Sequence, residues 1–488
     1  MNIVWVSSEA HPFAKTGGLA DVSHALPRAL AARGHNVSVI MPYYPQIMNR
    51  LHLKFTGEYD LLGVPFGEKT EWAKIRELKM GERWTFYFIE FNRFYDRPAL
   101  YDWFGNEYSD NGQRFIFLSR AAMQAVLALG LHPDIIHCND WHTALCSVYL
   151  NSSLYWDYPH FKNCRSVLTI HNIGYQGVYH KSNLLWTGLG WEFFNYHCLE
   201  FHDQIGLLKA GIMTSHMVNT VSPTYAEEIL SQEYGFNLDS SLRNRAAQGR
   251  LRGIINGIDD AEWNPASDHY LPAHYHRDNL GGKAVCKAAL QAELKLEQNP
   301  NKPLFGVVSR FAHQKGIDVL VESLEDLLIN DDYQFAILGA GDPWLHSRFD
   351  RLAALYPGKF GLFIGYNDRL AHLIEAGSDF FVMPSRYEPC GLNQMYSMRY
   401  GTAPVVRSTG GLADTVINYD RVRPWESTGF RFWDLYPKAL SGTMRWAASV
   451  YQNDKDGFYK MQYNGMSRDF SWNHTASEYE KLYEDAHK

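Results

Sequence analysis

Two glycine-rich segments of nearly identical sequence could each bring the backbone close to an anion. KTGGLADV occupies residues 15–22 and STGGLADTV occupies residues 408–416. We expect each to follow a strand and open a helix, where paired glycines permit close approach and the first N–H groups favour negative charge. One such turn is as often structural as ligand-binding. The presence of two matched copies favours the interpretation that both turns bind one ligand.

Charged residues near other predicted strand ends add to this chemistry. In VSRFAHQKG (308–316), Arg310 and Lys315 flank a turn just past a strand. Such a pair suits a pyrophosphate, because Arg offers a planar fork and Lys a point charge. The plainer alternative is an exposed, solvated pair. In PSRYEPCGLNQ (384–394), Glu388 could accept hydrogen bonds from hydroxyl groups while the backbone of the following turn donates others.

Three histidines raise the question of a metal site. His137 and His142 lie in HCNDWH, and His171 lies in TIHNIGYQG. No H-x-x-x-H pair accompanies a third ligand, and the Asp-x-Asp at residues 454–456 lies away from the other motifs. The spacing therefore argues against a metal, and no cofactor is expected.

Short apolar segments alternate with longer stretches of helical periodicity along the chain. This alternation is typical of a doubly wound parallel sheet. It predicts an α/β fold with two Rossmann-like domains. The predicted strands are residues 2–6, 37–41, 134–138, 166–170 and 217–221 in the first half, and 304–310, 335–341, 360–365, 379–385 and 403–407 in the second.

The length of the chain also requires more than one domain. A chain of 488 residues exceeds the roughly 250–300 residues at which single cores stop growing. A turn-rich seam at residues 249–265 predicts one domain over residues 1–250 and a second over residues 251–466. The remaining tail, residues 467–488, is a predicted helix whose apolar face could pack back on the first domain.

Composition excludes several classes of partner. The net charge of −7 argues against nucleic acid, which requires a basic surface. The six cysteines contain no C-x-x-C pair, so we expect reduced thiols. No apolar run of 18 residues and no signal-peptide pattern is present. We therefore expect a cytoplasmic protein without membrane partners, and the oligomeric state stays open.

Taken together, the motifs resemble those of a known family. In chain order they are similar to those of bacterial glycogen synthases and plant starch synthases: KTGGLADV, DNGQRF, NDWHTAL, TIHNIGYQG, VSPTYAEEI, INGID, SRFAHQKG, PSRYEPCGLNQ and STGGLADTV. The resemblance covers essentially the whole chain. It implies a GT-B fold, with two Rossmann-like domains facing across a cleft. It also implies transfer of glucose from ADP-glucose to the non-reducing end of an α-1,4-glucan such as glycogen, with retention of anomeric configuration.

The resemblance implies roles for the matched residues. Arg310 and Lys315 would bind the departing diphosphate, and His171 and Glu388 would contact the transferred glucose. Lys15 would contact the donor phosphate, Tyr366 the adenine, and the backbone of residues 390–392 the glucose. The full set of donor-binding positions is Lys15, Gly17, Gly18, Tyr366, Cys390, Gly391, Leu392, Thr409, Gly410, Gly411 and Leu412. The acceptor-side candidates are Glu9, Asp21, Asp140 and Asn256.

Two positions depart from the family's pattern. Asn-Asp follows Tyr366, where many members have a residue followed by Glu, which bears on the adenine pocket. Asn139 stands at the second His of the commoner H-x-H-D-W-H. We expect both departures to lie outside the core chemistry.

The residues also indicate a mechanism. A glycosidase needs two carboxylates flanking the bond, and Glu388 is the only acidic residue in the strongest motif. A nucleoside diphosphate leaves without a strong acid, so stabilisation of its charge is the main requirement. Arg310, Lys315, Lys15 and two helix N-termini would supply it. An internal-return route fits this arrangement, and a covalent intermediate stays open. Gly18→Val and Gly411→Val should each impair catalysis while leaving the fold largely intact.

Three other classes of protein fit the sequence less well. A nicotinamide-dependent oxidoreductase needs G-x-G-x-x-G, and GAGDPW (339–344) lacks the third glycine. A glucan-binding protein without catalysis has no use for a diphosphate clamp. A pyridoxal-phosphate sugar phosphorylase would not explain both glycine turns. The preference for ADP-glucose over UDP-glucose rests on the resemblance alone, and the acceptor chain length stays open.

Overall fold

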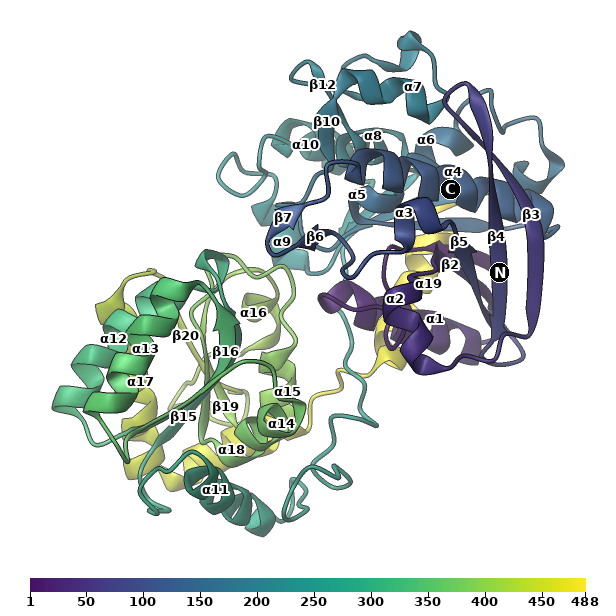
Figure 1. The fold of residues 1–488 in the computed structure, drawn as a ribbon. Coiled ribbons are helices and arrows are strands. Elements are labelled where there is room, and N and C mark those ends of the chain that lie inside the picture. Colours follow the sequence, from purple (N-terminus) through teal and green to yellow (C-terminus); the bar gives the residue numbers. More distant parts are fainter. The chain divides into compact units, whose positions relative to one another are not determined.

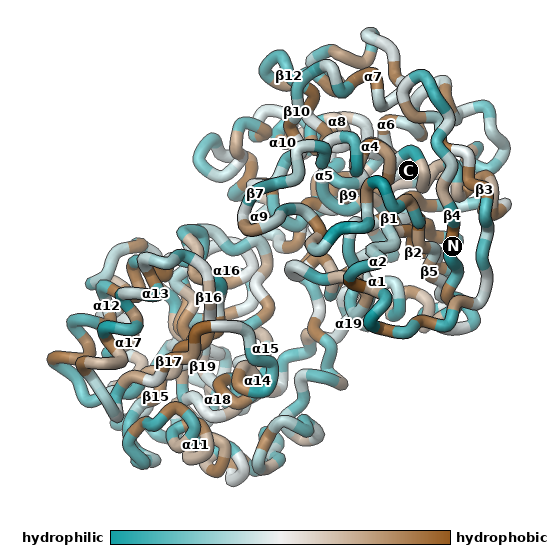
Figure 2. Tube along the Cα trace, viewed as in Figure 1, coloured by the Kyte–Doolittle hydropathy of each residue, from teal (hydrophilic) through white to brown (hydrophobic).

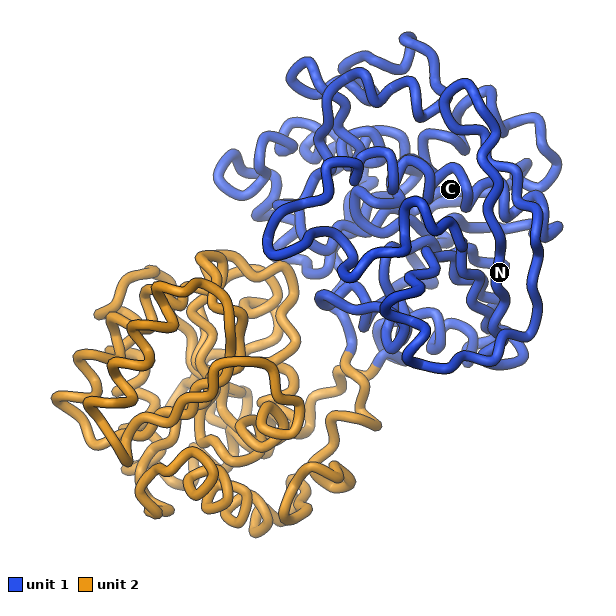
Figure 3. The backbone as a smooth tube through the Cα atoms, in the orientation of Figure 1, with its two compact units in different colours: residues 1–257, 472–488 blue, residues 258–471 orange.

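The computed structural model describes residues 1–488 and divides into two compact units. Unit 1 comprises Met1–Gly257 and Trp472–Lys488, and unit 2 comprises Ile258–Ser471 (Figure 3). The first boundary lies beyond the predicted one at 250/251. The reason is that Leu251–Gly253 form a strand, β14, that pairs with β13 (Met217–Thr220) and so belongs to the sheet of unit 1.

Unit 1 is built on a nine-stranded sheet in the order β14-β13-β9-β8-β1-β2-β5-β4-β3, of which β2, β5, β4 and β3 are labelled in Figure 1. The strands from β14 to β5 are parallel, and β4 and β3 extend the sheet antiparallel. The central strands are buried on both faces, as parallel sheets require. The remaining bounds are β9 (Arg165–Ile170), β8 (Ile135–Asn139), β1 (Asn2–Val6), β2 (Asn36–Pro42), β5 (Trp84–Glu90), β4 (Lys69–Lys79) and β3 (Gly57–Phe66).

Helices cover this sheet, and two small sheets lie in its connections. The helices of unit 1 are α1 (Gly18–Ala32), α2 (Pro45–Met48), α3 (Asn92–Tyr95), α4 (Asn111–Ala128), α5 (Asp140–Thr143), α6 (Leu145–Leu150), α7 (Leu184–Thr187), α8 (Leu207–Thr214), α9 (Pro223–Glu228), α10 (Asp239–Ala247) and α19 (Trp472–Ala486). The small sheets are formed by β6 (Asp102–Trp103) with β7 (Asn106–Glu107), and by β10 (Val178–His180), β12 (Gln204–Gly206) and β11 (Glu200–Phe201).

Unit 2 is built on a six-stranded sheet in the order β17-β16-β15-β18-β19-β20, and every pair is parallel. Its strands are β15 (Leu304–Phe311), β16 (Gln334–Gly341), β17 (Phe360–Ile364), β18 (Phe380–Met383), β19 (Ala403–Arg407) and β20 (Phe430–Phe432). Its helices are α11 (Gly281–Glu293), η5 (His313–Lys315), α12 (Ile317–Asn330), α13 (Pro343–Leu355), α14 (Asp368–Gly377), α15 (Asn393–Arg399), α16 (Gly410–Thr415), α17 (Pro437–Asn453) and α18 (Lys455–Met466).

Each unit therefore has its own apolar core. In the hydropathy-coloured trace, apolar residues follow the strands inside each unit, and polar residues follow the outer loops (Figure 2). No helix combines the length and apolarity needed to cross a membrane. The last helix, α19, buries Trp472, Tyr479 and Tyr483 in the core of unit 1. Its Glu480 also pairs with Arg33 at the end of α1, at 2.7 Å.

The chain crosses between the units twice, at 257/258 and at 471/472. On the unit 1 side, a methyl group added to Gly257 would lie 2.8 Å from the Trp472 ring. On the unit 2 side, Ile258 N–H donates to the Phe470 carbonyl at 2.8 Å. The two segments that cross between the units thus contact each other on both sides of the crossing, by close packing in unit 1 and by a backbone hydrogen bond in unit 2.

We predict that Gly257→Ala lowers the free energy of unfolding by about 1–3 kcal/mol, because the added carbon overpacks against Trp472. Gly442→Ala in α17 is the matched control, since nothing lies within 4 Å of its added carbon. That variant should be unchanged or stabilised by up to about 1 kcal/mol. Calorimetric unfolding of both checks this, and equal behaviour of the two variants would contradict it.

Candidate active site

Three loops of unit 2 meet at one edge of its sheet because β15, β18 and β19 are parallel neighbours. Their carboxyl ends lead into η5, into the loop at 384–392 and into α16, respectively. In open parallel sheets, ligands bind at this edge. Within unit 2, the residues predicted for the diphosphate and the glucose lie on these three loops or, for Arg310, at the end of β15.

Lys315 and Glu388 form an ion pair at this edge. Lys315 Nζ donates to Glu388 Oε2 at 2.6 Å, and Ser385 Oγ donates to the same oxygen at 2.9 Å. The Glu388 side chain is buried, yet its Oε1 accepts no hydrogen bond within the protein. One carboxylate oxygen therefore orients the Lys315 ammonium, and the other can accept a ligand hydroxyl.

Arg310 differs from Lys315 in having no ionic partner. It lies at the carboxyl end of β15, is exposed, and its guanidinium makes no ion pair or hydrogen bond. By contrast, Arg386 is held by Asp318 through two contacts of 2.7 and 2.6 Å. Arg310 is thus a cation of this edge whose charge a ligand anion could neutralise.

The second glycine turn, residues 409–412, is buried rather than open. Carbon atoms added to Gly410 and Gly411 would each lie 2.0 Å from a backbone carbonyl oxygen, that of Glu388 and that of Cys390. The Gly411 N–H already donates to the Glu388 carbonyl at 3.1 Å. The helix that follows, α16, has six residues, too few for a useful dipole. The expectation that Gly411→Val would spare the fold is therefore wrong.

The turn at residues 390–392 keeps donors available. Gln394 Nε2 donates to the carbonyls of Cys390 and Gly391 at 3.1 and 3.0 Å, which fixes the turn. Gly391 has a φ of +70°, a conformation that favours glycine. The N–H groups of Gly391 and Leu392 donate to no protein acceptor, so they can donate to sugar hydroxyls.

Tyr366 is the predicted adenine contact. It is 82% exposed, beyond the end of β17, and its hydroxyl donates to Asp368. The structure thus places Asp368 of the divergent Asn-Asp pair beside Tyr366. No contact joins Tyr366 to Arg310, Lys315 or Glu388, so its role rests on the sequence alone.

The first glycine turn, in unit 1, is open. Gly17 and Gly18 are exposed at the start of the 15-residue helix α1, and nothing lies within 4 Å of a carbon added to either. Lys15 pairs with Asp21 at 2.7 Å. The two T-G-G-L-A-D copies therefore differ. The first is open and can contact a ligand, whereas the second packs against the loop that contains Glu388 and Cys390.

Glu9 lies beneath the first turn. Its buried carboxylate accepts from Thr16 N–H at 2.5 Å and from Thr16 Oγ1 at 2.9 Å. Burial raises the pKa of Glu9 to about 7, although the Thr16 hydrogen bonds oppose the rise. The acceptor-side candidate Glu9 thus also positions the segment that carries Lys15.

His171, Asn139 and Asp140 form a second cluster in unit 1. His171 N–H donates to Asp140 Oδ1 at 2.7 Å, and His171 Nε2 lies 2.9 Å from Asn139 Oδ1. Burial lowers the pKa of His171 to about 3 and raises that of Asp140 to about 7. The imidazole is therefore neutral at pH 7. Asn139, expected to lie outside the core chemistry, thus contacts the ring of the candidate residue His171 through its amide oxygen.

The other two histidines of the quoted motifs, His137 and His142, are buried in the core of unit 1. His137 Nδ1 lies 2.9 Å from the Tyr483 hydroxyl, and its Nε2 lies 2.7 Å from Thr169 Oγ1. His142 stacks against Trp141. No three His, Cys, Asp or Glu side chains come together as metal ligands. Asn256 lies just before the first crossing, and its Oδ1 is buried without a hydrogen-bond partner.

Three residues of these clusters were not singled out for a role from the sequence. Ser385, Thr16 and Asn139 each hydrogen-bond a predicted site residue. All three lie inside or beside a quoted motif. In the sequence, their hydroxyl and amide groups indicate only that they can form hydrogen bonds. The folded structure is needed to show which carboxylate or imidazole each one contacts.

We predict opposite outcomes for valine in the two glycine turns. Gly18→Val should keep wild-type thermal stability and lose turnover per folded molecule, because its side chain occupies open space beside the exposed turn. Gly411→Val should lose about 1–3 kcal/mol or more of stability, because the added carbon overlaps the Cys390 carbonyl. Thermal unfolding and active-fraction assays check this. A stable, inactive Gly411→Val would contradict it.

We also predict that Glu9 makes stability depend on pH. Folding raises the pKa of Glu9 from about 4.5 to about 7. The contribution of its protonated form to the free energy of unfolding is therefore full below pH 4.5 and is lost as the pH rises through 7. The side chain in Glu9→Gln stays neutral. As the pH rises from 5 to 8, the free energy of unfolding of this variant should therefore increase by about 1–3 kcal/mol relative to that of the wild type. The exposed Glu82→Gln is the control. Parallel stability curves for Glu9→Gln and wild type would refute the prediction.

Each unit matches a family of known proteins. Residues 2–244 match the starch synthase catalytic domain, and residues 291–448 match the glycosyl transferases group 1. Glycogen synthase 1 of Geobacter sulfurreducens is 45% identical over 99% of this chain and 96% of its own. Glycogen synthase of Anaeromyxobacter sp. is 46% identical over 99% of both chains.

A solved structure agrees with these sequence matches. The catalytic domain of starch synthase IV from Arabidopsis thaliana, bound to ADP and acarbose, superposes with a TM-score of 0.88 at 33% identity, over 99% of both chains. The fold is accordingly of the GT-B type. Since the matches span both units and nearly every residue, the chain belongs to the glycogen synthase and starch synthase family of glycosyltransferases.

Proposed function

We propose that this protein transfers glucose from ADP-glucose to the non-reducing end of an α-1,4-glucan, with retention of anomeric configuration, in glycogen or starch synthesis. The observation that carries the proposal is the near full-length similarity to proteins named glycogen synthase. The ADP in the related starch synthase structure supports an adenine donor. The Lys315–Glu388 pair beside Arg310 supplies the chemistry that such a reaction needs.

The residues of unit 2 act on the donor. Arg310 offers two N–H groups to the diphosphate, and its unpaired charge favours the dianion that develops as the glycosyl bond breaks. The Lys315 ammonium, oriented by Glu388 Oε2, donates to a leaving phosphate oxygen. Glu388 Oε1 accepts from a glucose hydroxyl, and the N–H groups of Gly391 and Leu392 donate to others. These contacts orient the sugar and stabilise the leaving group.

The residues of unit 1 act on the other reactants. The open amides of Gly17 and Gly18, with Lys15, suit donor phosphate oxygens. His171, held by Asn139 and neutral at pH 7, can hydrogen-bond the transferred glucose without placing a positive charge beside it. The leaving phosphate, rather than a carboxylate, would take the proton of the attacking hydroxyl. Cationic side chains and amides stabilise the diphosphate, so we propose that no divalent ion is required.

The test compares nucleotide release from ADP-glucose and UDP-glucose, each with and without maltoheptaose, and each with excess EDTA. We expect ADP release that depends on maltoheptaose, lower release from UDP-glucose, and no effect of EDTA. Preference for UDP-glucose would reject the donor assignment alone. Release without an acceptor would reject the transfer reaction, and loss of activity in EDTA that added metal restores would reject the metal-free mechanism.

We predict that Lys315→Ala lowers kcat by about 10²–10³, the usual loss when one preorganised charge-stabilising group is removed. Lys315→Ala also leaves Glu388 buried without its cation. The double variant Lys315→Ala/Glu388→Gln removes that imbalance and should fold well, yet stay inactive. Near wild-type turnover of folded Lys315→Ala at saturating ADP-glucose would contradict the role assigned to Lys315.

A further inference from the structure

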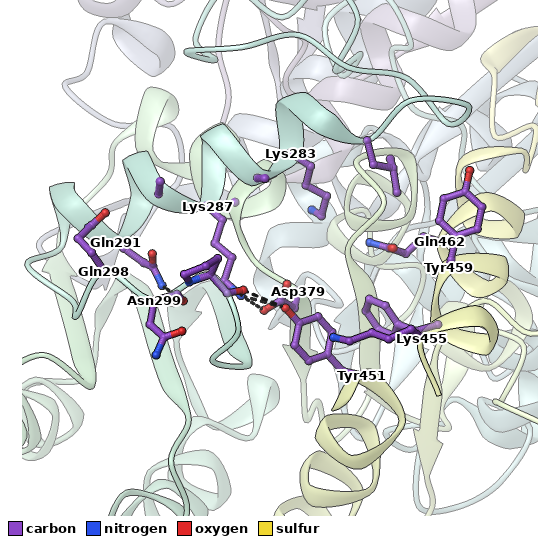
Figure 4. A pocket seen from close by; sticks show the side chains of 16 residues that line it. Lys283, Lys287, Gln291, Gln298, Asn299, Asp379, Tyr451, Lys455, Tyr459 and Gln462 are labelled. Atoms are coloured by element: carbon purple, nitrogen blue, oxygen red, sulfur yellow. Dashed lines mark hydrogen bonds and ion pairs between the residues drawn. The ribbon is translucent and has the colours of Figure 1, made fainter. Parts of the chain in front are cut away.

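A groove of about 470 Å³ lies in unit 2, away from the loops described above. One wall is α11, and the other consists of α17 and α18 (Figure 4). Its lining includes Asp379, which directly precedes β18, and Pro300, which lies a few residues before β15. The groove is therefore at the amino ends of the strands. Arg310 lies at the other end of β15, about 20 Å away at ~3.3 Å per residue.

The lining of the groove carries excess positive charge. Lys283, Lys287 and Lys455 line the groove together with a single carboxylate, that of Asp379 (Figure 4). Asp379 already forms an ion pair, since Lys287 Nζ lies 2.6 Å from its Oδ2. Asp379 balances only one of the three positive charges, so Lys283 and Lys455, neither of which forms an ion pair, leave an excess of two positive charges among the lining residues.

The first of these lysines is buried. Lys283 Nζ donates to the carbonyls of Ala376 and Tyr400 and to Thr402 Oγ1, at 2.8, 3.1 and 2.6 Å. These neutral acceptors satisfy its hydrogen bonds and leave its charge. Burial lowers the pKa of Lys283 to about 8, so the ammonium persists at pH 7. Nearby Glu375 is also buried, and burial raises its pKa while the charge of Lys283 opposes that rise.

The second is Lys455, at the start of α18. Its Nζ lies 3.8 Å from the centroid of the Tyr451 ring and makes no hydrogen bond or ion pair. A tyrosine face orients an ammonium without using its N–H donors. Lys455 can therefore donate three hydrogen bonds to an anion in the groove.

The rest of the lining mixes polar and apolar side chains, which suits an organic group that carries hydroxyls. Gln298, Asn299 and Gln462 contribute amides, and Tyr459, which is 46% exposed, contributes a ring. The volume lies within the range of sites for small metabolites, roughly 300–1,000 Å³. A phosphate monoester carries about −1.5 to −2 charges at pH 7, which matches two unpaired lysines.

We propose that this groove binds a small phosphorylated metabolite at a site separate from the donor site, with Lys455 as the direct phosphate ligand. Lys283 adds charge from within, and the amides and Tyr459 contact the remainder of the molecule. The ligand would join α11 to α18. These helices lie nearest in sequence to the two crossings between units, so a bound ligand would link the chain segments that lead to both.

Binding is tested by calorimetric titration with inorganic phosphate and with glucose 1-phosphate, at constant ionic strength, with glucose as the neutral control. We expect both phosphates to bind and glucose not to bind. Lys455→Gln should weaken phosphate binding about tenfold or more, the effect of losing a charge-assisted hydrogen bond. Lys460→Gln, an exposed charge change on the same helix outside the groove, should bind like the wild type.

Arg310→Ala separates this site from the donor site, and the readout needs no catalysis, so it stands apart from the proposed function. Phosphate binding that survives in Arg310→Ala and weakens in Lys455→Gln supports the proposal. Tighter binding of glucose 1-phosphate than of phosphate would show that the sugar is contacted as well. Binding lost in Arg310→Ala and kept in Lys455→Gln would overturn it. So would maltotriose binding, abolished by Tyr459→Ala, without phosphate binding.

Discussion

Close backbone packing at the carboxyl edge of unit 2 is the constraint on which the candidate active site depends. At Gly316, Gly410 and Gly411, an added carbon would lie 1.9 to 2.0 Å from a carbonyl oxygen of the segment 384–390. No side chain fits at such separations. Because glycine stands at all three positions, the loops after β15, β18 and β19 contact each other through their main chains. That contact brings Lys315 to Glu388 and fixes the turn whose amides face outward.

Charge pairing is the second organising feature. Lys15 pairs with Asp21, and Lys315 pairs with Glu388, whereas Arg310 has no partner. Pairing holds a long lysine side chain in one orientation and spares the protein a cluster of unbalanced cations. An arriving diphosphate can take over hydrogen bonds from a lysine that is already oriented. The groove beside α11 differs, because its one carboxylate, Asp379, pairs with Lys287, and neither Lys283 nor Lys455 forms an ion pair.

Much of the fold could be predicted from the sequence because it follows from local patterns. All ten predicted strands are strands, within a few residues, since buried parallel strands read as short apolar runs between helical segments. The domain boundary was placed too early, because Leu251–Gly253 are too few to signal a strand and become one only by pairing with β13. The antiparallel strands β3 and β4 were not predicted, since their exposed face weakens the apolar pattern.

For the candidate site, the sequence by itself determined which residues are candidates for the chemistry. Arg310, Lys315, Glu388 and the two T-G-G-L-A-D segments are identified by residue type and by position after a strand. Only the tertiary structure decided how they act. The two segments are the same in sequence, yet Gly18 faces open space and Gly411 packs against Cys390. Likewise, Asn139 became a partner of His171 only when β8 and β9 paired. A residue's neighbours across a sheet edge come from strand order and register, and no local pattern in the chain encodes those contacts.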